Sequence, residues 1–463
     1  MLRRVSRSPV ALVRTLGLWQ CIGIAVGTII GTGVFLKAAV MAQLAGSPLW
    51  VLLAWAVGGA LSLAGALTYA ELGGMFPEAG GEYVYLREAY GRFAGYVYGW
   101  TRFWIGSPGS IAAYGVGAAT FLSGVLPVER MGGIKVVAIA LIAVFAIIGC
   151  LRVRVGGNLQ VALTALKVAL ILGLAVGAFL LPPGAGWSNL HPSSSASDGA
   201  FPGLSAFGLT ILAALWAYDG WNNLPMAAGE VANPERQLPR ALVLGSVAVL
   251  AIYAAINLAY FYALPFAEVA SSSSTRFPSA PPVAAKVAAT FLGDGTGGLL
   301  AFAMTVSALS AMHGSILTGA RVPFAMARDG LAPRRLAELS GAAVPARSVV
   351  VLCATASALA LTGSFDQLTN SVVFASWIFY ALNAGSVIVL RMRQPQRARP
   401  FRVPGYPVVP AVFALLSGLL LFNTAISSIR DTLLGLALIA LSVPVYLLMR
   451  RAERRRAPPD AAR

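Results

Sequence analysis

Two short stretches, GTIIGTG at residues 27–33 and WAYDGWNN at residues 216–223, interrupt segments that are otherwise apolar. Three glycines in seven residues weaken the first segment as a helix, and a carboxylate, a glycine and two amides are foreign to a plain apolar helix. Inside a membrane, backbone that leaves helical geometry is tolerated only where it is buried in protein or lines a wet cavity. The glycines alone also fit close helix packing through small residues, so it is the second stretch that favours two broken helices.

The composition places these stretches in a membrane protein. Of the 463 residues, 58% are hydrophobic and 11% are charged, and the mean hydropathy is +0.76. Soluble proteins carry about 25% charged residues, so a water-soluble enzyme or a disordered chain is excluded. The apolar runs are continuous rather than alternating, which argues against a membrane barrel. The predicted fold class is therefore an all-α polytopic membrane protein.

Twelve apolar segments are predicted to be membrane-spanning helices, since a span needs about 20 apolar residues. They cover residues 17–44, 48–74, 93–125, 132–151, 157–182, 203–230, 238–264, 297–327, 346–362, 367–390, 405–427 and 432–449. The polar and aromatic stretch 77–90 predicts a short helix along the membrane surface. The longest predicted loops, 183–202 and 265–296, are rich in serine and proline and too short for a soluble domain.

The net charge of +17 follows a positive-inside pattern and does not mark a nucleic-acid-binding protein. Arginines gather in the two tails, 1–16 and 450–463, and in the loops after the fourth, eighth and tenth spans. Few basic residues lie in the opposite loops. Both tails are therefore predicted on the cytoplasmic side of the cell membrane. The first span is predicted to be retained, because no small-residue cleavage site follows it.

The two interrupted spans are five spans apart. Because five is odd, two groups of five helices, 17–182 and 203–390, would have opposite orientations in the membrane, and interrupted helices in matching positions are typical of inverted-repeat transporters. A broken helix exposes N–H groups that suit a carboxylate and carbonyls that suit an ammonium group. Two such breaks fit the zwitterion of an α-amino acid.

Several motifs resemble those of a known family. They are GTIIGTGVF (27–35), YAELGGMFPEAGGEYVYLREAYG (69–91), WAYDGWNNLPMAAGEVANPERQLPRAL (216–242), GSILTGARVPFAMARDGLAP (314–333) and RPFRVPGYPVVP (399–410). Together they resemble the amino acid–polyamine–organocation superfamily, and within it the L-type amino acid transporter-like branch. The resemblance implies a five-plus-five inverted repeat with the first and sixth helices broken, followed by two extra helices at 405–449.

The resemblance also implies a substrate site at the two breaks. The substrate carboxylate would meet the first span, and the ammonium group would meet main-chain carbonyls of both breaks. An aromatic residue of the sixth span would cover the substrate from outside. The residues implied are Thr32 and Gly33 for the carboxylate, the carbonyls of Ile29, Trp216, Ala217 and Asp219 for the ammonium group, Trp216 as the cover, and Ser110 and Asn222 as pocket-lining residues.

Lys167 lies in the middle of the fifth span, about ten residues or 15 Å from its start at Gly157. A lysine at this depth is costly unless it is paired or wet, although snorkelling to the interface is an alternative. The resemblance implies that the lysine replaces a sodium ion and tethers the first span to the eighth, and hence that transport is sodium-independent. The expected partners are the Gly27 carbonyl and the hydroxyl of Ser307 or Ser310.

Two further polar residues have open roles. His313 in the eighth span departs from the family pattern, and it is either a packed, hydrogen-bonded residue or a group that couples protons or selects side chains. Asp219 either attracts a cationic side chain, carries a proton, or caps free N–H groups of the following half-helix. Glu71, Glu78 and Glu82 are expected in a cytoplasmic gating or structural network, with Arg102 as a possible partner of Glu71.

Three functions remain open on the sequence. The first is a sodium-independent amino acid transporter, in particular an exchanger working by alternating access. The second is proton-coupled uptake of cationic amino acids or polyamines through Asp219 and His313. The third, from another class, is a sensor that binds an amino acid without moving it. No set of catalytic residues is recognisable at membrane depth, so no enzyme is expected.

The predicted partners are an amino acid substrate and the lipid bilayer. No cofactor, metal or nucleic acid is expected, because Cys21, Cys150 and Cys353 form no ligand cluster with histidines. Animal members of the branch bind a heavy chain through a cysteine after the third span. The corresponding loop here, 126–131, has no cysteine, so no disulfide-linked heavy chain is expected.

Overall fold

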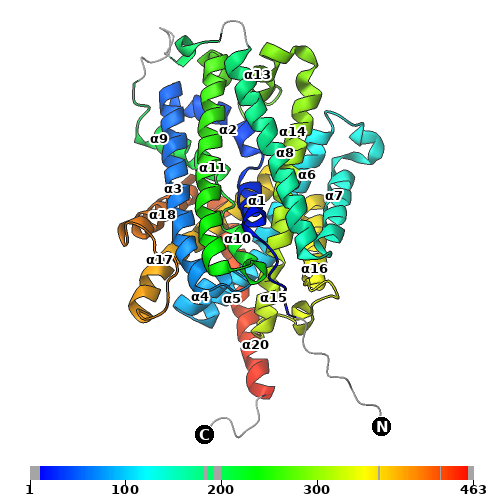
Figure 1. Cartoon of the computed structure of the whole chain (residues 1–463), viewed down its shortest axis with the longest axis vertical. Helices are drawn as coiled ribbons and strands as arrows, with labels where there is room; N and C mark the ends of the chain where they lie inside the picture. Colours follow the sequence, from blue (N-terminus) through cyan, green and yellow to red (C-terminus); the bar gives the residue numbers. More distant parts are fainter. Residues whose placement is uncertain (1–10, 182–184, 191–199, 363–364, 428, 457–463) are drawn as a thin grey trace.

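A computed structural model describes residues 11–181, 185–190, 200–362, 365–427 and 429–456 (Figure 1). Within these residues the regular structure is helical, apart from one isolated bridge between Leu16 and Val231. The helices run side by side as a bundle, with α4, α5, α15 and α20 gathered at one end and α13 at the other (Figure 1). The end that carries α4 and α20 is called the α4 end below. The predicted all-helical class is confirmed.

The helices follow the predicted spans closely. In the first part of the chain they are α1 (Leu18–Ile29), α2 (Gly33–Ala45), α3 (Pro48–Met75), α4 (Glu82–Tyr90), α5 (Arg92–Thr101), α6 (Ser107–Leu122), α7 (Gly133–Gly149) and α8 (Val153–Leu180). In the second part they are α9 (Leu204–Ala217), α10 (Asn223–Met226), α11 (Pro234–Ala263), α12 (Phe266–Ala270), α13 (Val283–Leu292), α14 (Gly297–Gly319), α15 (Arg321–Arg328), α16 (Ala346–Thr362), α17 (Phe365–Arg393), α18 (Val408–Ser427), α19 (Ile429–Ala440) and α20 (Ser442–Arg456).

Prolines and glycines set several of these boundaries. Pro48 and Pro234 occupy the first turns of α3 and α11, where a missing N–H costs nothing. Gly46 ends α2 in the left-handed conformation, with φ of 72°, which glycine adopts without strain.

Five helical stretches of the described chain are long and apolar enough to cross a membrane. They are Leu18–Ala45, Pro48–Met75, Val153–Leu180, Pro234–Ala263 and Gly297–Arg328. Shorter apolar helices, such as α7, α9 and α16, accompany them. Several apolar helices are thus present as expected, while the count of twelve spans stays a prediction.

Three segments differ from the sequence-based expectation. The predicted loop 265–296 contains two helices, α12 and α13, and the apolar α13 packs against α8. The ten residues of α13 are enough for a helix but too few for a membrane span. The surface helix expected over 77–90 begins only at Glu82, after Gly80 and Gly81 with φ of 113° and 53°. The last predicted span is divided into α19 and α20.

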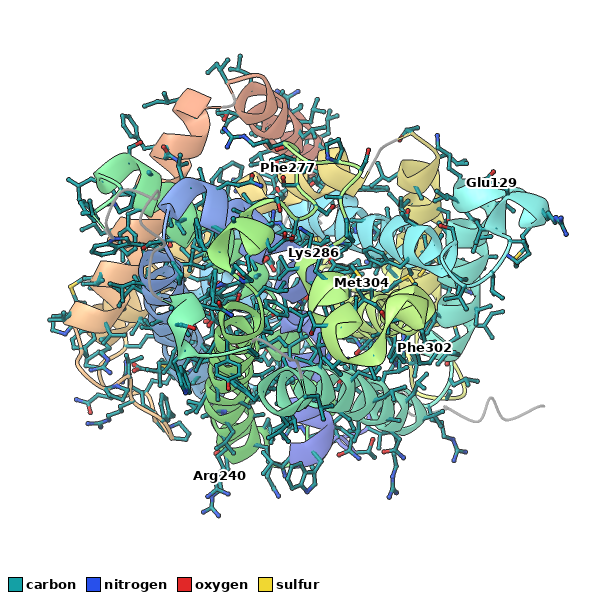
Figure 2. All side chains as sticks on the ribbon, turned by 90° about the horizontal axis from the view of Figure 1, so that it is seen from above. Glu129, Arg240, Phe277, Lys286, Phe302 and Met304 are labelled. Carbon is teal, nitrogen blue, oxygen red and sulfur yellow. The ribbon has the colours of Figure 1, made fainter. Side chains whose placement is uncertain are left out.

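The first broken helix lies at the centre of the bundle. α1 packs against α8, α11 and α14, and 83% of the apolar window in Leu18–Ala45 is buried, against 33% for that in α8. Seen from above, the other helices surround this centre, with Lys286 near the middle of the view and Glu129 at the edge (Figure 2). A break in α1–α2 is therefore enclosed by protein, as membrane-embedded irregular backbone must be.

Candidate functional site

The first break lies between α1 and α2. Helical geometry ends at Ile29, and Ile30 is extended with φ of −74° and ψ of 92° before α2 begins at Gly33. Thr32 is buried, and its Oγ1 has no hydrogen-bond partner in the described structure. The interruption predicted from the glycines is present, and it leaves main-chain groups free of helical partners.

The second break, residues 218–222, lies so close to the first that their main chains are in contact. The Thr28 hydroxyl donates to the Gly220 carbonyl at 2.9 Å. Gly220 has φ of 129°, and a Cβ there would lie 2.5 Å from the carbonyl oxygen of Thr28. An added Cβ at Gly33 would likewise meet Ala217 Cβ at 2.9 Å. Only glycine allows both the conformation and the close approach at position 220.

A tyrosine that sequence reasoning missed joins the two breaks. The Tyr253 hydroxyl of α11 donates to the Ala217 carbonyl at 3.0 Å and lies 3.4 Å from the Ile29 carbonyl, which is a second acceptor for the same proton. These are two of the carbonyls expected to receive a substrate ammonium group. The available signal was a tyrosine in an apolar helix, because a buried hydroxyl needs a polar partner.

Lys167 reaches the first break from α8. Its Nζ donates to the Gly27 carbonyl at 2.7 Å and to the Ile30 carbonyl. The side chain is 1% exposed, so it does not snorkel. Ser307 of α14 donates to the Gly31 carbonyl at 2.8 Å and lies 3.3 Å from that of Ile30. The expected contact of Lys167 with the Gly27 carbonyl is found. Ser307 does not contact the lysine directly, and the two side chains share the Ile30 carbonyl as an acceptor.

The same face of α8 carries two more polar side chains that the sequence reading passed over. Thr164 donates to the Gly23 carbonyl at 2.9 Å, and Gln160 Nε2 lies 3.2 Å from the hydroxyl of Ser310. The spacing of positions 160, 164 and 167 on one helical face was the signal that could have found them. Together with Lys167 they form a polar seam between α1, α8 and α14.

Asp219 faces the bundle beside the second break. It is half-buried, and its Oδ1 accepts a hydrogen bond of 2.6 Å from the hydroxyl of Tyr380 in α17. α10 has no side-chain cap at Asn222, and the Asp219 carboxylate accepts from the main-chain N–H of the adjacent Gly220 rather than from α10 itself. Tyr114 of α6 also lies here, with its Cε1 3.5 Å from where a Gly31 Cβ would be.

The remaining predicted pocket residues lie around this centre in different ways. Trp216 packs over Gly33, and the Lys37 ammonium lies 4.3 Å from the centre of its ring. Ser110 lies one turn before Tyr114, and its hydroxyl donates to the Gly106 carbonyl of its own helix at 2.9 Å. Asn222 points away from the first break, because its amide donates to Glu82 Oε2 at 3.2 Å.

His313 is not part of the group at the breaks. It is fully buried, its Nε2 lies 2.9 Å from the Gly156 carbonyl of α8, and its ring centre is 5.4 Å from that of Phe145 in α7. The structure thus places it as a packed, hydrogen-bonded residue. Its contacts are with the α7–α8 side of α14.

The acidic residues of the α4 end form separate clusters. Glu71 pairs with Arg391 through contacts of 2.9 and 2.7 Å and accepts from the main-chain N–H of Val403, so the suggested pair with Arg102 is wrong. Glu78 lies 3.6 Å from Arg87 at the surface. Burial raises the pKa of the Glu82 carboxyl, while the nearby Arg102 charge and the donated hydrogen bonds act in the opposite direction.

A buried ion pair at the α4 end was not anticipated. Arg321 binds Glu230 through two contacts of 2.8 Å, and the side chains are 1% and 0% exposed. The main-chain N–H groups of Thr15 and Leu16 donate to the Glu230 carbonyl at 2.9 Å. Thr15 and Leu16, predicted as part of a tail, therefore pair with the segment after α10.

Within the described residues no group of three or more histidine, cysteine or acidic side chains is arranged to hold a metal ion. The site therefore consists of main-chain groups of two helix breaks, with Lys167, Tyr253, Asp219 and Tyr380 around them. A helical bundle with two interrupted helices meeting at its centre defines a secondary transporter of small molecules.

Comparison with known proteins agrees with this class. The model of a family described as amino acid permease matches residues 16–444. The serine/threonine exchanger SteT of Bacillus subtilis is 31% identical over 96% of this chain and 98% of its own length. The human b(0,+)-type amino acid transporter 1 is 32% identical over 90% of this chain and 84% of its own. The mouse Asc-type amino acid transporter 1 is 30% identical over 95% and 82%.

The chain belongs to the amino acid permease family, in the L-type amino acid transporter-like branch of the amino acid–polyamine–organocation superfamily. The family resemblance stated from the motifs is thereby confirmed. The relatives named are transporters rather than enzymes, and an amino acid substrate and a membrane location follow from the family.

Proposed function

We propose that this protein is a sodium-independent amino acid exchanger that works by alternating access. The observation that carries the proposal is the Lys167 ammonium at the Gly27 and Ile30 carbonyls, where its positive charge takes the place of a bound cation. A charge held on the protein needs no ion from solution. The exchange mode is supported by the relative named as a serine/threonine exchanger.

The substrate lies, in this proposal, between the two breaks. Thr32 and the N–H groups at the start of α2 receive the carboxylate, since a helix N-terminus suits an anion. The carbonyls of Ile29, Ala217, Trp216 and Asp219 face the ammonium group, and Tyr253 holds the first two in place. Trp216 covers the substrate, and Ser110 lines the pocket. Asn222 lines it on the side of Glu82, to which its amide donates. Lys167 connects the first break to α8.

The wider arrangement is part of the same proposal. Twelve spans, of which 17–182 and 203–390 form two inverted repeats and 405–449 two extra helices, cross the cell membrane with both termini in the cytoplasm. The arginine bias of the loops supports this orientation. The protein works without a disulfide-linked heavy chain, as the cysteine-free loop 126–131 suggests.

The first prediction tests the proposed function itself. In proteoliposomes loaded with unlabelled amino acid, uptake of labelled serine, alanine or leucine is expected to be faster than in empty vesicles. Replacing sodium by choline is expected to leave the initial rate unchanged, because Lys167 already supplies the positive charge. A strict sodium requirement would contradict the lysine argument, and specific binding without flux would point to a sensor.

Proton-coupled uptake of cationic substrates remains as a second function, because the half-buried Asp219 is a suitable acceptor for a cation or a proton. Asp219→Asn keeps the shape and the contact with Tyr380. Under cation selection it is expected to lose arginine and lysine transport and keep neutral amino acids; under proton carriage it loses pH-driven accumulation and keeps exchange. His313→Gln tests the other group weighed for proton coupling. It is expected to keep pH-driven accumulation, since His313 lies away from the breaks. Transport of every substrate at wild-type rates in Asp219→Asn would rule out both roles.

A further inference from the structure

A small cavity lies beside the second break, toward the α4 end. It is lined from four parts of the chain, among them Glu82 of α4, Arg102, Asn222 of the second break and Tyr380 of α17. The volume open to the centre of a water molecule is about 10 Å³, room for about one water molecule. Asn222 is also proposed above to line the substrate pocket, whereas Glu82 and Arg102 have no role in the proposal so far.

Arg102 supplies an unused donor there. It begins a π-helical turn, Arg102–Gly106, between α5 and α6, and such turns are frequent at functional sites. Its Nη2 donates to Asn223 Oδ1 at 2.6 Å, while the buried Nε has no hydrogen-bond partner. The residue is only 7% exposed. A buried donor of a guanidinium that lacks a partner is costly, so a ligand that accepts from it is favoured.

Glu82 supplies the opposite charge. Its carboxylate accepts hydrogen bonds from four neutral side chains, those of Tyr69, Tyr98, Asn222 and Asn383. Arg102 attracts the Glu82 carboxylate electrostatically, yet the two form no direct ion pair. The cavity therefore has an anionic group on one side and a cationic group on the other, with no direct ion pair between them. These charges are complementary to the ammonium and carboxylate groups of an α-amino acid.

The cavity adjoins the central site through the unwound backbone. Asn223, which holds Arg102, also donates to the Gly220 carbonyl at 3.0 Å, the acceptor of the Thr28 hydroxyl. Tyr380 lines the cavity and donates to Asp219. The cavity and the second break are therefore connected through Asn223 and Tyr380.

We propose that this cavity is a second, transient binding site for the substrate zwitterion on its way to or from the α4 end, with Arg102 binding the carboxylate and Glu82 the ammonium group. The proposal rests on the proposed transport function. In this conformation the site is collapsed to the size of a water molecule, and it opens when the Tyr380 and Asn222 side chains separate.

The test is the sidedness of the Michaelis constant. Uptake is measured in intact cells and in inverted membrane vesicles with one labelled neutral amino acid, and the accessibility of a C-terminal tag to protease identifies the α4 face. In Arg102→Met the KM at that face is expected to rise about tenfold, the effect of losing one charged hydrogen bond, while the KM at the other face stays unchanged. Arg102→Lys keeps the charge and is expected to show a smaller rise on the same side.

Thr101→Val is the matched control, because Thr101 also lines the cavity but its hydroxyl donates only within its own helix, to the Val97 carbonyl. It is expected to leave both KM values unchanged. Equal shifts at the two faces, or no shift in either Arg102 variant, would overturn the second site. An unchanged KM at the α4 face in Arg102→Lys decides against it even where Arg102→Met does not fold. Absence of any amino acid flux in the wild type would instead contradict the proposed function.

Discussion

Lys167→Met is expected to lower the rate of amino acid exchange by at least about tenfold, the effect of losing one buried, charged hydrogen bond. Methionine keeps most of the length and volume of the side chain but cannot donate to the Gly27 and Ile30 carbonyls. The Ile30 carbonyl retains Ser307, and that of Gly27 loses the donor at 2.7 Å. The position of α1 relative to α8 and α14 is then less well defined, so the substrate site forms less often.

The measurement is the initial exchange rate in proteoliposomes containing equal amounts of monodisperse protein. Leu166→Ala is the matched control, since Leu166 is the preceding residue of α8, is 41% exposed, and faces away from the polar seam. It is expected to exchange at close to the wild-type rate. A folded Lys167→Met protein with wild-type exchange would remove the lysine from the mechanism.

Arg321→Met is expected to give the largest loss of stability, about 3–5 kcal/mol, because it leaves the buried Glu230 carboxylate without its cation. The side chains of this pair are 1% and 0% exposed, so water cannot replace the lost partner. The Glu230 carbonyl also anchors Thr15 and Leu16, and the loss therefore extends to the start of α1. The measurement is the midpoint of thermal aggregation in detergent.

Arg347→Met serves as the comparison for this effect. Arg347 pairs with Glu338 at the surface, where both side chains are more than half exposed, and such pairs contribute less than about 1 kcal/mol. Replacing both members of the buried pair, in Glu230→Gln with Arg321→Met, is expected to recover part of the lost stability. Equal midpoints for Arg321→Met and Arg347→Met would contradict the importance of burial.

The sequence predicted the features of the fold that depend on local pattern. The glycines of 27–33 and the polar run of 216–223 placed both breaks, because glycine and buried polar groups weaken a helix wherever it packs. The helix α13 was missed, since a mostly apolar segment of ten residues after a serine-rich stretch gives neither the length of a span nor a clear cap. α4 begins later than predicted because Gly80 and Gly81 have positive φ. Their conformation depends on tertiary contacts.

The candidate site was predicted where its chemistry is carried by main chain and by one unusual charge. Lys167 stood out because an ammonium group at membrane depth needs partners. Tyr253 did not, because the two carbonyls it joins come from residues more than 30 positions away along the chain. The predicted partner of Glu71, Arg102, was wrong for the same reason, since Glu71 pairs with Arg391. Pairings between distant helices depend on packing, which cannot be read from a single sequence.

The two inner half-helices are fastened to each other at both ends. Near the middle of the bundle the Thr28 hydroxyl lies 2.9 Å from the Gly220 carbonyl, which shares its proton with the Ile24 carbonyl at 2.7 Å, and at the α4 end Leu16 pairs with Val231. α1 and the segment containing α10 are therefore joined to each other at both ends. The backbone is extended at Ile30 and has positive φ at Gly220, so we expect bending at these two residues. Two segments joined in this way are expected to move as one unit. If the α4 end opens, we therefore expect α1 and the segment containing α10 to move away from the other helices together.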